Sequence, residues 1–466
     1  MKPTGILVND IHSQLNETRV DRVVCSDSVQ MIQAVIEQAK AEGRAISIAG
    51  GRHAMGGQQF GTDTILLDTG AMNRVLNFDC GEGLIEVQAG IRWPELLSYL
   101  DRVQVGRWPQ WGIRQKQTGA DRLTLGGAIA ANVHGRALTL PPIVADVESL
   151  VLVDASGEAR TCSRSDDPEL FSLVVGGYGL FGVVYSVTLR LVPRRKVERV
   201  VEVRSIDGLL AAFDERIRSG FLYGDFQFAT DPGSDDFLSR GVFSCYRPVP
   251  DDTPMPAGQR ALSLDDWKGL LYLAHASKSE AFERYAAHYL ATSGQIYYSD
   301  GHQMGEYIDD YHVELDRVLG AAHAGTEMIS ELYVPRDRLS EFVAGVAEDF
   351  RRTGVDVIYG TIRLIERDDE TFLPWARDRF ACIIFNLHTE HTPEGLERSA
   401  DAFRNLIDAA SSKGGSYFLT YHRWATKEQL LRCYPQFPAF LERKLEYDPE
   451  ERFQSDWYRH YRELLE

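Results

Sequence analysis

The chain has 466 residues, 44% of them hydrophobic, and a formal net charge of −18 at pH 7. This length predicts two or three globular domains, and the acidic balance argues against nucleic acid or an anionic membrane surface as a partner. No apolar run reaches the roughly 20 residues of a membrane span, and the N-terminus lacks the apolar core of a secretory signal. Six cysteines are scattered without a CxxC pair, so we expect reduced thiols in a cytoplasmic protein.

The first part of the chain predicts a β-rich domain interrupted by short helices. Apolar residues at helical spacing or in short alternating runs mark its elements. These are a helix over 27–42, strands over 45–49, 64–69 and 84–90, a short helix over 93–101, and β-rich segments over 123–135, 147–158 and 183–193.

From about Arg194 the pattern changes to long amphipathic helices that alternate with strands. The helices are expected over 277–293, 338–354 and 395–415, and the strands over 330–335, 356–365 and 381–390. This alternation predicts an α+β substrate domain. The Asp-, Pro- and Ser-rich stretch 230–262 is expected to be a loop or lid, and the tail from Tyr417 to fold back on the first domain.

A formal G-x-G-x-x-G occurs at Gly177, Gly179 and Gly182. A dinucleotide-binding Rossmann motif needs a helix directly after its glycines, with its N-terminus at the pyrophosphate. The sequence that follows here, VVYSVTLRLV, alternates and is β-branched, which predicts a strand. We therefore reject NAD binding through this motif, and no P-loop sequence is present either.

Three glycine clusters, 50–57, 126–135 and 176–182, lie within the β-rich part. One cluster alone, and the third in particular, is equally well explained by turns. Three together favour a long ligand that runs close to the backbone, where glycines allow tight turns and present N–H groups to an anion. A dinucleotide such as FAD meets that demand.

The sequences AGGRHAMGGQ, TGADRLTLGGAIAANVHG and GGYGLFGVV carry a family resemblance. Together they resemble the FAD domain of the vanillyl-alcohol oxidase (PCMH-type) superfamily, over about residues 20–195. The tail YDPEERFQSD and the segment DVIYGTIRLIERDDETFLP are similar to the alditol and aldonolactone oxidase and the decaprenylphosphoryl-ribose oxidase branches.

This resemblance implies an α+β fold. Residues 1–195 would form a PCMH-type FAD-binding domain of two small α/β subdomains. Residues 196–415 would form an α+β substrate (cap) domain with an antiparallel sheet and flanking helices. Residues 416–466 would pack back on the FAD domain.

The resemblance also implies which residues bind FAD. The first loop would wrap the pyrophosphate, the second segment would follow the ribityl chain and isoalloxazine, and the third would meet the adenine side. The expected FAD-binding residues are Ala49, Gly50, Gly51, Arg52, His53, Ala54, Met55, Gly57, Gln58, Gly119, Thr124, Leu125, Gly126, Gly127, Asn132, Val133, His134, Gly135, Gly182 and Val183.

His53 occupies the position that carries a covalent 8α-histidyl bond to the flavin in several relatives. The alternative is that His53 only packs or bonds a phosphate, as in relatives that hold FAD non-covalently. A second attachment would need a cysteine near 126–135, and none is present. We expect at most a single covalent link.

Candidate catalytic residues come from the strands of the second domain. Tyr359, Thr361 and Arg363 share one face by the two-residue period, and Arg363 matches a substrate-contacting arginine of the alditol oxidases. Asn386 and His388 share a face of an apolar strand, which indicates either a cavity wall or a satisfied hydrogen bond in the core. No metal is expected, because a strand spacing of three points His388 away from the next histidine.

The tail departs from the family pattern at YFLTYHRWATK. Relatives place a lysine near the flavin, whereas here Tyr421 falls at that position, and Lys427 lies further along. Tyr421 could donate a hydrogen bond, and the adjacent His422 could act as a base near neutral pH. Because of this departure, a phosphorylated-sugar or simple alditol substrate is not carried over from the relatives.

We expect an FAD-dependent oxidoreductase that oxidises a CH–OH group of a sugar, polyol or lactone-like substrate by hydride transfer to flavin N5. Flavin-dependent reduction of a C=C bond and a non-catalytic flavoprotein are the alternatives. The expected partners are a small-molecule substrate and an electron acceptor, either O2 or an unidentified carrier.

Overall fold

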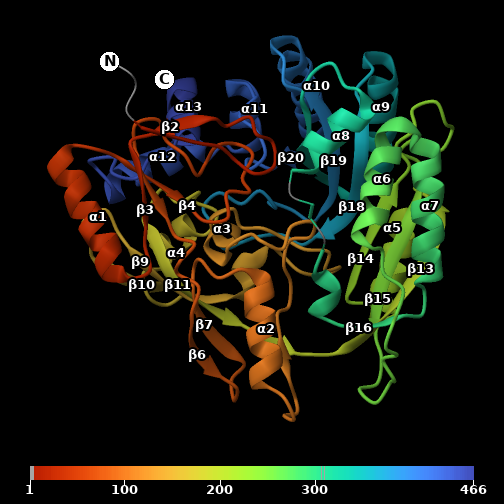
Figure 1. Ribbon diagram of the computed structural model, residues 1–466, viewed down its shortest axis with the longest axis horizontal. Coiled ribbons are helices and arrows are strands. Elements are labelled where there is room, and N and C mark those ends of the chain that lie inside the picture. Colours follow the sequence, from red (N-terminus) through yellow and green to blue (C-terminus); the bar gives the residue numbers. More distant parts are fainter. Residues whose placement is uncertain (1–4, 306, 309) are drawn as a thin grey trace.

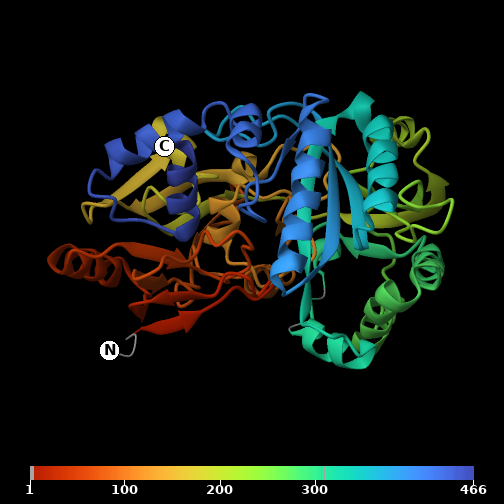
Figure 2. The same cartoon turned by 90° about the horizontal axis from the view of Figure 1, so that it is seen from above.

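The computed structural model describes residues 5–305, 307–308 and 310–466, which form two lobes lying side by side (Figures 1 and 2). One lobe contains the N-terminal part, coloured red to yellow, together with the dark blue C-terminal helices. The other contains the green to light-blue middle of the chain. The N-terminal lobe is built on two sheets, and the second lobe on one large sheet.

The first sheet of the N-terminal lobe is parallel and three-stranded, with β4 at one edge. Its order is β3 (Arg22–Cys25), β5 (Ile65–Asp68), β4 (Ile46–Ala49). Helix α1 (Val29–Glu42) packs on it through Ile32 and Ile36, and a left-handed Gly43 ends the helix, as expected from the sequence. A two-stranded ribbon, β1 (Ile6–Val8) and β2 (Thr18–Val20), precedes this sheet.

The second sheet is antiparallel and five-stranded. Its order is β10 (Ala159–Ser163), β9 (Val147–Val153), β11 (Val183–Arg190), β7 (Leu84–Gln88), β6 (Val75–Asp79). The remaining elements of this region are α2 (Trp93–Val103), β8 (Trp111–Gly112), α3 (Leu125–Ala130), the 3-10 turn Ile143–Asp146, α4 (Pro168–Val174) and β12 (Val192–Pro193). The strand expected after Gly182 is β11, so the Rossmann motif is absent there.

The segment 123–135, expected to continue the β-rich pattern, contains the short helix α3 instead. Thr124 caps this helix, because its hydroxyl accepts the N–H of Gly127. Capping and a run of small residues outweigh the weak strand signal of the flanking apolar residues.

The second lobe is built on an eight-stranded antiparallel sheet. Its order is β16 (Ile296–Tyr298), β13 (Lys196–Ser205), β15 (Arg240–Pro248), β14 (Tyr223–Phe228), β18 (Val357–Ile365), β19 (Phe380–Glu390), β17 (Gly325–Pro335), β20 (Ser416–Tyr417). Strand β15 lies inside the stretch 230–262, which was expected to be a loop or lid. Its run GVFSCY is buried throughout, a signal that the surrounding polar residues obscured.

Helices cover both faces of this sheet (Figure 2). One face carries α5 (Leu209–Arg218), α9 (Leu339–Thr353) and α10 (Pro393–Ser411), and the other carries α6 (Leu264–Ala276), α7 (Lys278–Ala291) and α8 (Tyr311–Leu319). Short 3-10 turns occupy Gly301–Gln303 and Arg336–Arg338. Neighbouring residues of β15 show the division, because Phe243 packs against Phe213 of α5 and Val242 lies with Ala286 of α7.

The C-terminal tail returns to the N-terminal lobe, as expected, through α11 (Lys427–Cys433), α12 (Phe437–Tyr447) and α13 (Asp456–Leu465). Phe453 pairs in parallel with Ile46 at the edge of β4. The backbone N–H of Ile46 donates to Arg452 at 2.7 Å, and that of Gln454 donates to Ile46 at 2.9 Å. The tail therefore adds a single parallel bridge to the edge of the sheet.

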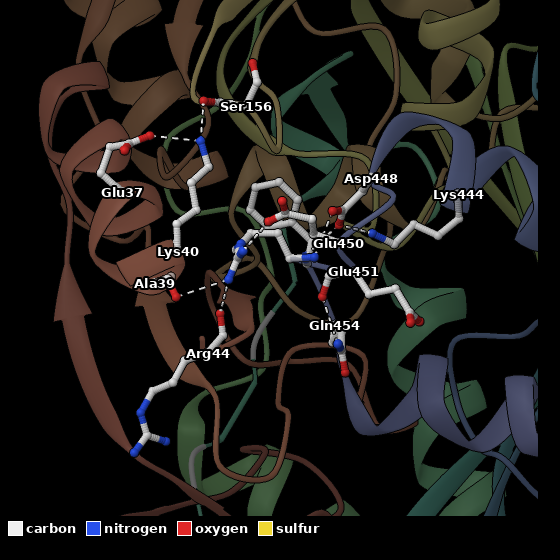
Figure 3. Close-up of polar contacts among 12 residues, drawn as sticks. Glu37, Ala39, Lys40, Arg44, Ser156, Lys444, Asp448, Glu450, Glu451 and Gln454 are labelled. Carbon is white, nitrogen blue, oxygen red and sulfur yellow. Dashed lines mark hydrogen bonds and ion pairs between the residues drawn. The ribbon is translucent and has the colours of Figure 1, made fainter. Parts of the chain in front are cut away.

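A buried ion pair holds this segment in place (Figure 3). The ammonium of Lys444 and the carboxylate of Asp448 are 0% and 1% exposed. Asp448 also accepts the backbone N–H groups of Arg452 and Phe453, each at 2.8 Å. The sequence DPEERF thus fixes the turn that brings Phe453 to the sheet.

Candidate functional site

A cavity of about 680 Å³ lies between the two lobes. Its walls on the N-terminal side are the glycine loop after β4, the start of α3 with the loop before it, and the turn before β11. Its floor is the sheet of the second lobe, on the face that also carries α6 and α7. The cavity therefore brings the glycine clusters and the second-domain strands into one site.

Hydrogen bonds with both the N-terminal segment and the C-terminal tail hold the loop 50–58 in place. The Gln58 amide donates to the carbonyl oxygens of Leu419 and Thr420 in the tail. The Asn16 amide donates to the carbonyl of Met55 at 2.7 Å. Inside the loop, Arg52 has a φ of +58°, a left-handed conformation that is uncommon for residues other than glycine. Such a loop is a rigid cradle rather than a flexible linker.

Most of the expected FAD-binding residues line the cavity. These are Gly50, Gly51, Arg52, His53, Ala54, Met55, Gln58, Gly119, Thr124, Gly126, Gly127, Val133, His134 and Gly182. The other six, Ala49, Gly57, Leu125, Asn132, Gly135 and Val183, are not among the lining residues.

Contacts with other parts of the protein explain why three of these six do not line the cavity. Val183 points into the core, and Val184, one residue along the same strand, lines the cavity in its place. Asn132 donates to Asp368 at 2.9 Å. Gly135 packs so tightly that a Cβ would lie 2.5 Å from a neighbouring carbonyl oxygen.

His53 lies in the cavity wall with its Nδ1 2.8 Å from Nε2 of His12. Burial, assisted by positive side chains nearby, lowers the pKa of His53 to about 3. The imidazole is therefore neutral, and Nε2 is left to face other groups. A neutral ring is the form that can act as a nucleophile.

The face predicted for β18 is the one that lines the cavity. Tyr359, Thr361 and Arg363 all contribute to the floor, and Asn386 of β19 lies beside them. The Arg363 guanidinium donates to the hydroxyl of Thr118, and its Nε has no hydrogen-bond partner among the described residues. The floor thus presents a buried cation and several polar atoms to a ligand.

A buried network surrounds Glu331 of β17, which also lines the cavity. Its carboxylate accepts the hydroxyl of Tyr333 and the thiol of Cys382, and lies 2.7 Å from Nε2 of His134. Burial alone would raise the pKa of Glu331, but these neighbours hold it below its usual value. Burial and this carboxylate together raise the pKa of Tyr421 well above its usual value, so its phenol stays protonated and can donate.

His134 connects Glu331 to the second glycine segment. Its Nε2 lies 2.7 Å from the carboxylate of Glu331, and its Nδ1 lies 3.0 Å from the carbonyl oxygen of Gly135. His134 and Glu331 therefore form a buried, hydrogen-bonded pair in the cavity wall.

Two catalytic candidates do not line the cavity. Burial lowers the pKa of His422 to about 3, and its ring packs against Phe403 and Trp424. His422 follows Tyr421 directly in an irregular segment, and only Tyr421 lines the cavity, so the role of base does not fit His422. His388 is not among the lining residues, and its Nδ1 is 3.3 Å from Oε1 of Glu327, which does line the cavity.

Neither Lys427 nor Lys116 belongs to the cavity lining. Lys427 donates to the carbonyl of Leu465 at 2.7 Å, and it is not among the lining residues. A different lysine, Lys116, is fully buried near the cavity, 2.7 Å from Asp121. It also donates to the carbonyl of Gln117, so it fixes the loop that carries Thr118 and Gly119.

Sequence reasoning missed Glu331, Lys116 and Thr118. A signal existed for Glu331, since it is a charged residue in an apolar strand, the same pattern that pointed to Asn386. Lys116 and Thr118 lie in an irregular loop, where no periodicity marks the direction of a side chain.

Two groups of side chains have the types that bind metal ions. They are His134, Glu331 and Cys382, and His275, Glu327 and His388, with ligand atoms within 4.8 Å of one another in each group. In both groups a glutamate lies between hydrogen-bond donors or histidines, an arrangement that stabilises the carboxylate without a metal.

Comparison with known proteins identifies the N-terminal part. Residues 20–163 match the model of a family described as an FAD binding domain. This part of the chain is similar to FAD-binding domains. The predicted cofactor is confirmed, as is the resemblance to the aldonolactone oxidase and decaprenylphosphoryl-ribose oxidase branches.

Three relatives illustrate the similarity. The chain is 24% identical to L-gulono-1,4-lactone dehydrogenase of Mycobacterium tuberculosis over 436 residues, 91% of this chain and 92% of the relative. It is 27% identical to bovine (Bos taurus) L-gulonolactone oxidase over 41% of this chain and 42% of the relative. It is 26% identical to decaprenylphosphoryl-beta-D-ribose oxidase of Mycolicibacterium smegmatis over 44% of each chain.

The cavity fits FAD. At Gly119, with a φ of +91°, a Cβ would meet no protein atom within 4 Å. Gly179 also lines the cavity, and the nearest protein atom to a Cβ there would be 3.8 Å away. These positions leave room for a ligand against the backbone, as the glycine clusters predicted. In the described part of the chain, no helix is long and apolar enough to cross a membrane.

Proposed function

We propose that this protein is an FAD-dependent oxidoreductase that oxidises a CH–OH group of a sugar, polyol or lactone-like substrate. The observation that supports this most directly is the single cavity that joins the glycine loops to the polar floor of the second-lobe sheet. The named activities of the relatives, on gulonolactone and on a phosphorylated ribose, point to the same reaction class.

The floor has the chemistry of a site for a polyhydroxylated molecule. Several of its buried polar atoms lack hydrogen-bond partners among the described residues, including Oε1 of Gln227, Oγ1 of Thr361 and Nε of Arg363. A buried polar group without a partner costs about 1–3 kcal/mol. Substrate hydroxyl groups would supply both the donors and the acceptors that these atoms need.

Bound FAD would supply a hydride acceptor at N5. The protein must position the reacting carbon and stabilise the charge that develops beside it during the reaction. We assign positioning to Arg363 and Asn386, and we assign the stabilisation of charge to the pair of His134 and Glu331. Tyr421 donates a neutral hydrogen bond at the place where relatives have a lysine.

The direct test is anaerobic mixing of the purified flavoprotein with polyols, aldoses and aldonolactones. Loss of the oxidised flavin absorbance with at least one of them is the expected result, and Glu331→Gln should slow this loss while retaining bound FAD. If no compound bleaches the flavin, but an unsaturated compound reoxidises chemically reduced flavin, the protein is a C=C reductase instead.

We also propose that His53 carries FAD covalently. The support is its place in the cavity wall and its neutral ring. After acid precipitation, yellow colour should stay with the wild-type pellet and be absent from that of His53→Ala. Colour released into the wild-type supernatant would show that binding is non-covalent.

For the domains, we propose the division 1–195, 196–415 and 416–466. The contacts between the tail and β4 support the third unit as part of the FAD-binding lobe. Limited proteolysis of the flavoprotein should leave FAD bound to a complex of the first and third segments.

We propose O2 or a small electron carrier as the acceptor. Oxygen consumption compared with dye reduction, measured with the same reducing substrate, separates an oxidase from a dehydrogenase. We place the protein in the cytoplasm, because its six cysteines are free thiols. Cell fractionation with an antibody tests this.

A further inference from the structure

The cavity continues beyond Arg363, across the sheet toward β13, and there meets two more arginines. Arg199 of β13 and Arg136, which follows the second glycine segment, both line it. We call the end formed by these two residues and Tyr246 the arginine pocket. Neither arginine belongs to the FAD-contacting loops or to the catalytic candidates.

Tyr246 links the two arginines. Its fully buried ring has the guanidinium carbon of Arg136 at 5.4 Å and that of Arg199 at 5.3 Å from its centroid. Its hydroxyl accepts the Nε hydrogen of Arg199 at 2.9 Å. The rings of Tyr289 and Tyr297 also face Arg199, at 5.2 and 4.8 Å. Aromatic rings hold both guanidinium groups in place without neutralising them.

The charges of the pocket do not cancel. Arg136 lies 3.5 Å from the buried carboxylate of Asp225. Arg199, in contrast, has only hydroxyl partners, Tyr246 and Thr292, and no carboxylate within 4 Å among the described residues. One positive charge is therefore left over where solvent is largely excluded.

The other charged groups of the cavity do not supply the missing anion. Glu331 is paired with His134, and Glu327 lies 3.1 Å from His275 and 3.3 Å from His388. The excess positive charge of the pocket contrasts with the net charge of the whole chain, which is −18. A buried charge without a partner is costly, so such a site is suited to an anion that arrives with the ligand.

We propose that the arginine pocket binds the carboxylate of the substrate, so that the preferred substrates are sugar acids such as aldonates or uronates. This rests on the proposed oxidation of polyhydroxylated molecules and narrows it. The excess positive charge of Arg199 matches an anionic group, and a planar guanidinium pairs with a carboxylate through two parallel hydrogen bonds. The hydroxyl groups of the same molecule would lie over the polar floor, toward Arg363.

Binding is tested separately from oxidation. The purified flavoprotein is titrated with D-gluconate, D-glucitol and D-glucitol 6-phosphate, and the dissociation constant is read from the change in the flavin absorbance spectrum. D-gluconate should bind at least about tenfold more tightly than D-glucitol, as expected for one desolvated charged hydrogen-bond pair. Equal affinities, or no binding of D-gluconate, would overturn the proposal. Tighter binding of D-glucitol 6-phosphate than of D-gluconate would show that the pocket binds a phosphate group rather than a carboxylate, and would overturn the proposal.

Variants of Arg199 show whether the preference comes from this pocket. Arg199→Met should lower the affinity for D-gluconate to that for D-glucitol and leave D-glucitol unchanged, and Arg199→Lys should retain part of the preference. Arg218→Met, at a side chain that is 73% exposed, is the matched control. Flavin content and thermal midpoint establish that each variant is folded. A preference that survives in Arg199→Met refutes the assignment.

Flavin reduction by the same compounds is measured afterwards. If none of them reduces the flavin but D-gluconate binds preferentially, the arginine pocket stands and the proposed oxidation fails. If D-glucitol reduces the flavin and D-gluconate neither binds nor reacts, the oxidation stands and the pocket assignment fails.

Discussion

The buried pair of Lys444 and Asp448 gives a sharp test of how the tail stabilises the fold. Lys444→Met leaves the Asp448 carboxylate buried without its counter-ion. Removing one partner of a buried ion pair costs about 3–5 kcal/mol. Two backbone N–H groups still bind Asp448, so we expect the lower end of that range for the loss in free energy of unfolding.

The double variant Lys444→Met/Asp448→Asn separates charge from packing. It removes both charges, and the asparagine oxygen can still accept one of the two N–H groups. The expected cost is about 1–2 kcal/mol, the scale of one lost hydrogen bond in a buried place. The double variant should therefore be more stable than Lys444→Met alone.

Urea unfolding followed by circular dichroism and by flavin release measures both variants. Lys40→Met is the control, because Lys40 pairs with Glu37 on a half-exposed surface visible in the same view (Figure 3), and such pairs contribute about 1 kcal/mol or less. The reasoning fails if Lys444→Met costs no more than Lys40→Met, or if the double variant is as unstable as the single one.

Two further predictions concern the cavity and its floor. Gly50→Ala should weaken FAD binding, because a Cβ there would lie 2.1 Å from the hydroxyl of Thr124. The flavin retained on gel filtration measures this. The control is Gly345→Ala on a helix, where a Cβ meets no other atom within 4 Å, and this variant should retain FAD fully. The hydrogen bond that His388 donates to Glu327 raises the pKa of His388. The stability from this pair is therefore fully present below about pH 6.5 and is lost as the pH rises through the raised value. The free energy of unfolding should therefore fall between pH 6 and 8 by more in the wild type than in His388→Gln, and parallel pH profiles would contradict this.

The sequence predicted the features that depend on local patterns. The strand after Gly182 follows from β-branched alternation alone, and the inward face of Tyr359 and Arg363 follows from the two-residue period. The glycine clusters located the cavity, although at several of their positions, such as Gly50 and Gly182, a neighbouring protein atom leaves no room for a Cβ.

The features that it did not predict depend on contacts between distant residues. Glu331 and His134 are 197 positions apart and meet only once the sheet is packed on the N-terminal lobe. The directions of Tyr421 and His422 could not be separated, because both lie in an irregular segment without a period. The charge balance at Arg199 is likewise a property of the assembled cavity.

The return of the tail to β4 has a consequence for the order of events during synthesis. Loop 50–58 emerges early from the ribosome, but residues 452–454, which cover the open edge of β4, are made almost four hundred residues later. Until then the FAD-binding domain has an unpaired strand edge, a surface that promotes misassembly. We therefore expect a nascent chain stopped before Phe453 to hold the cofactor less well than the released chain.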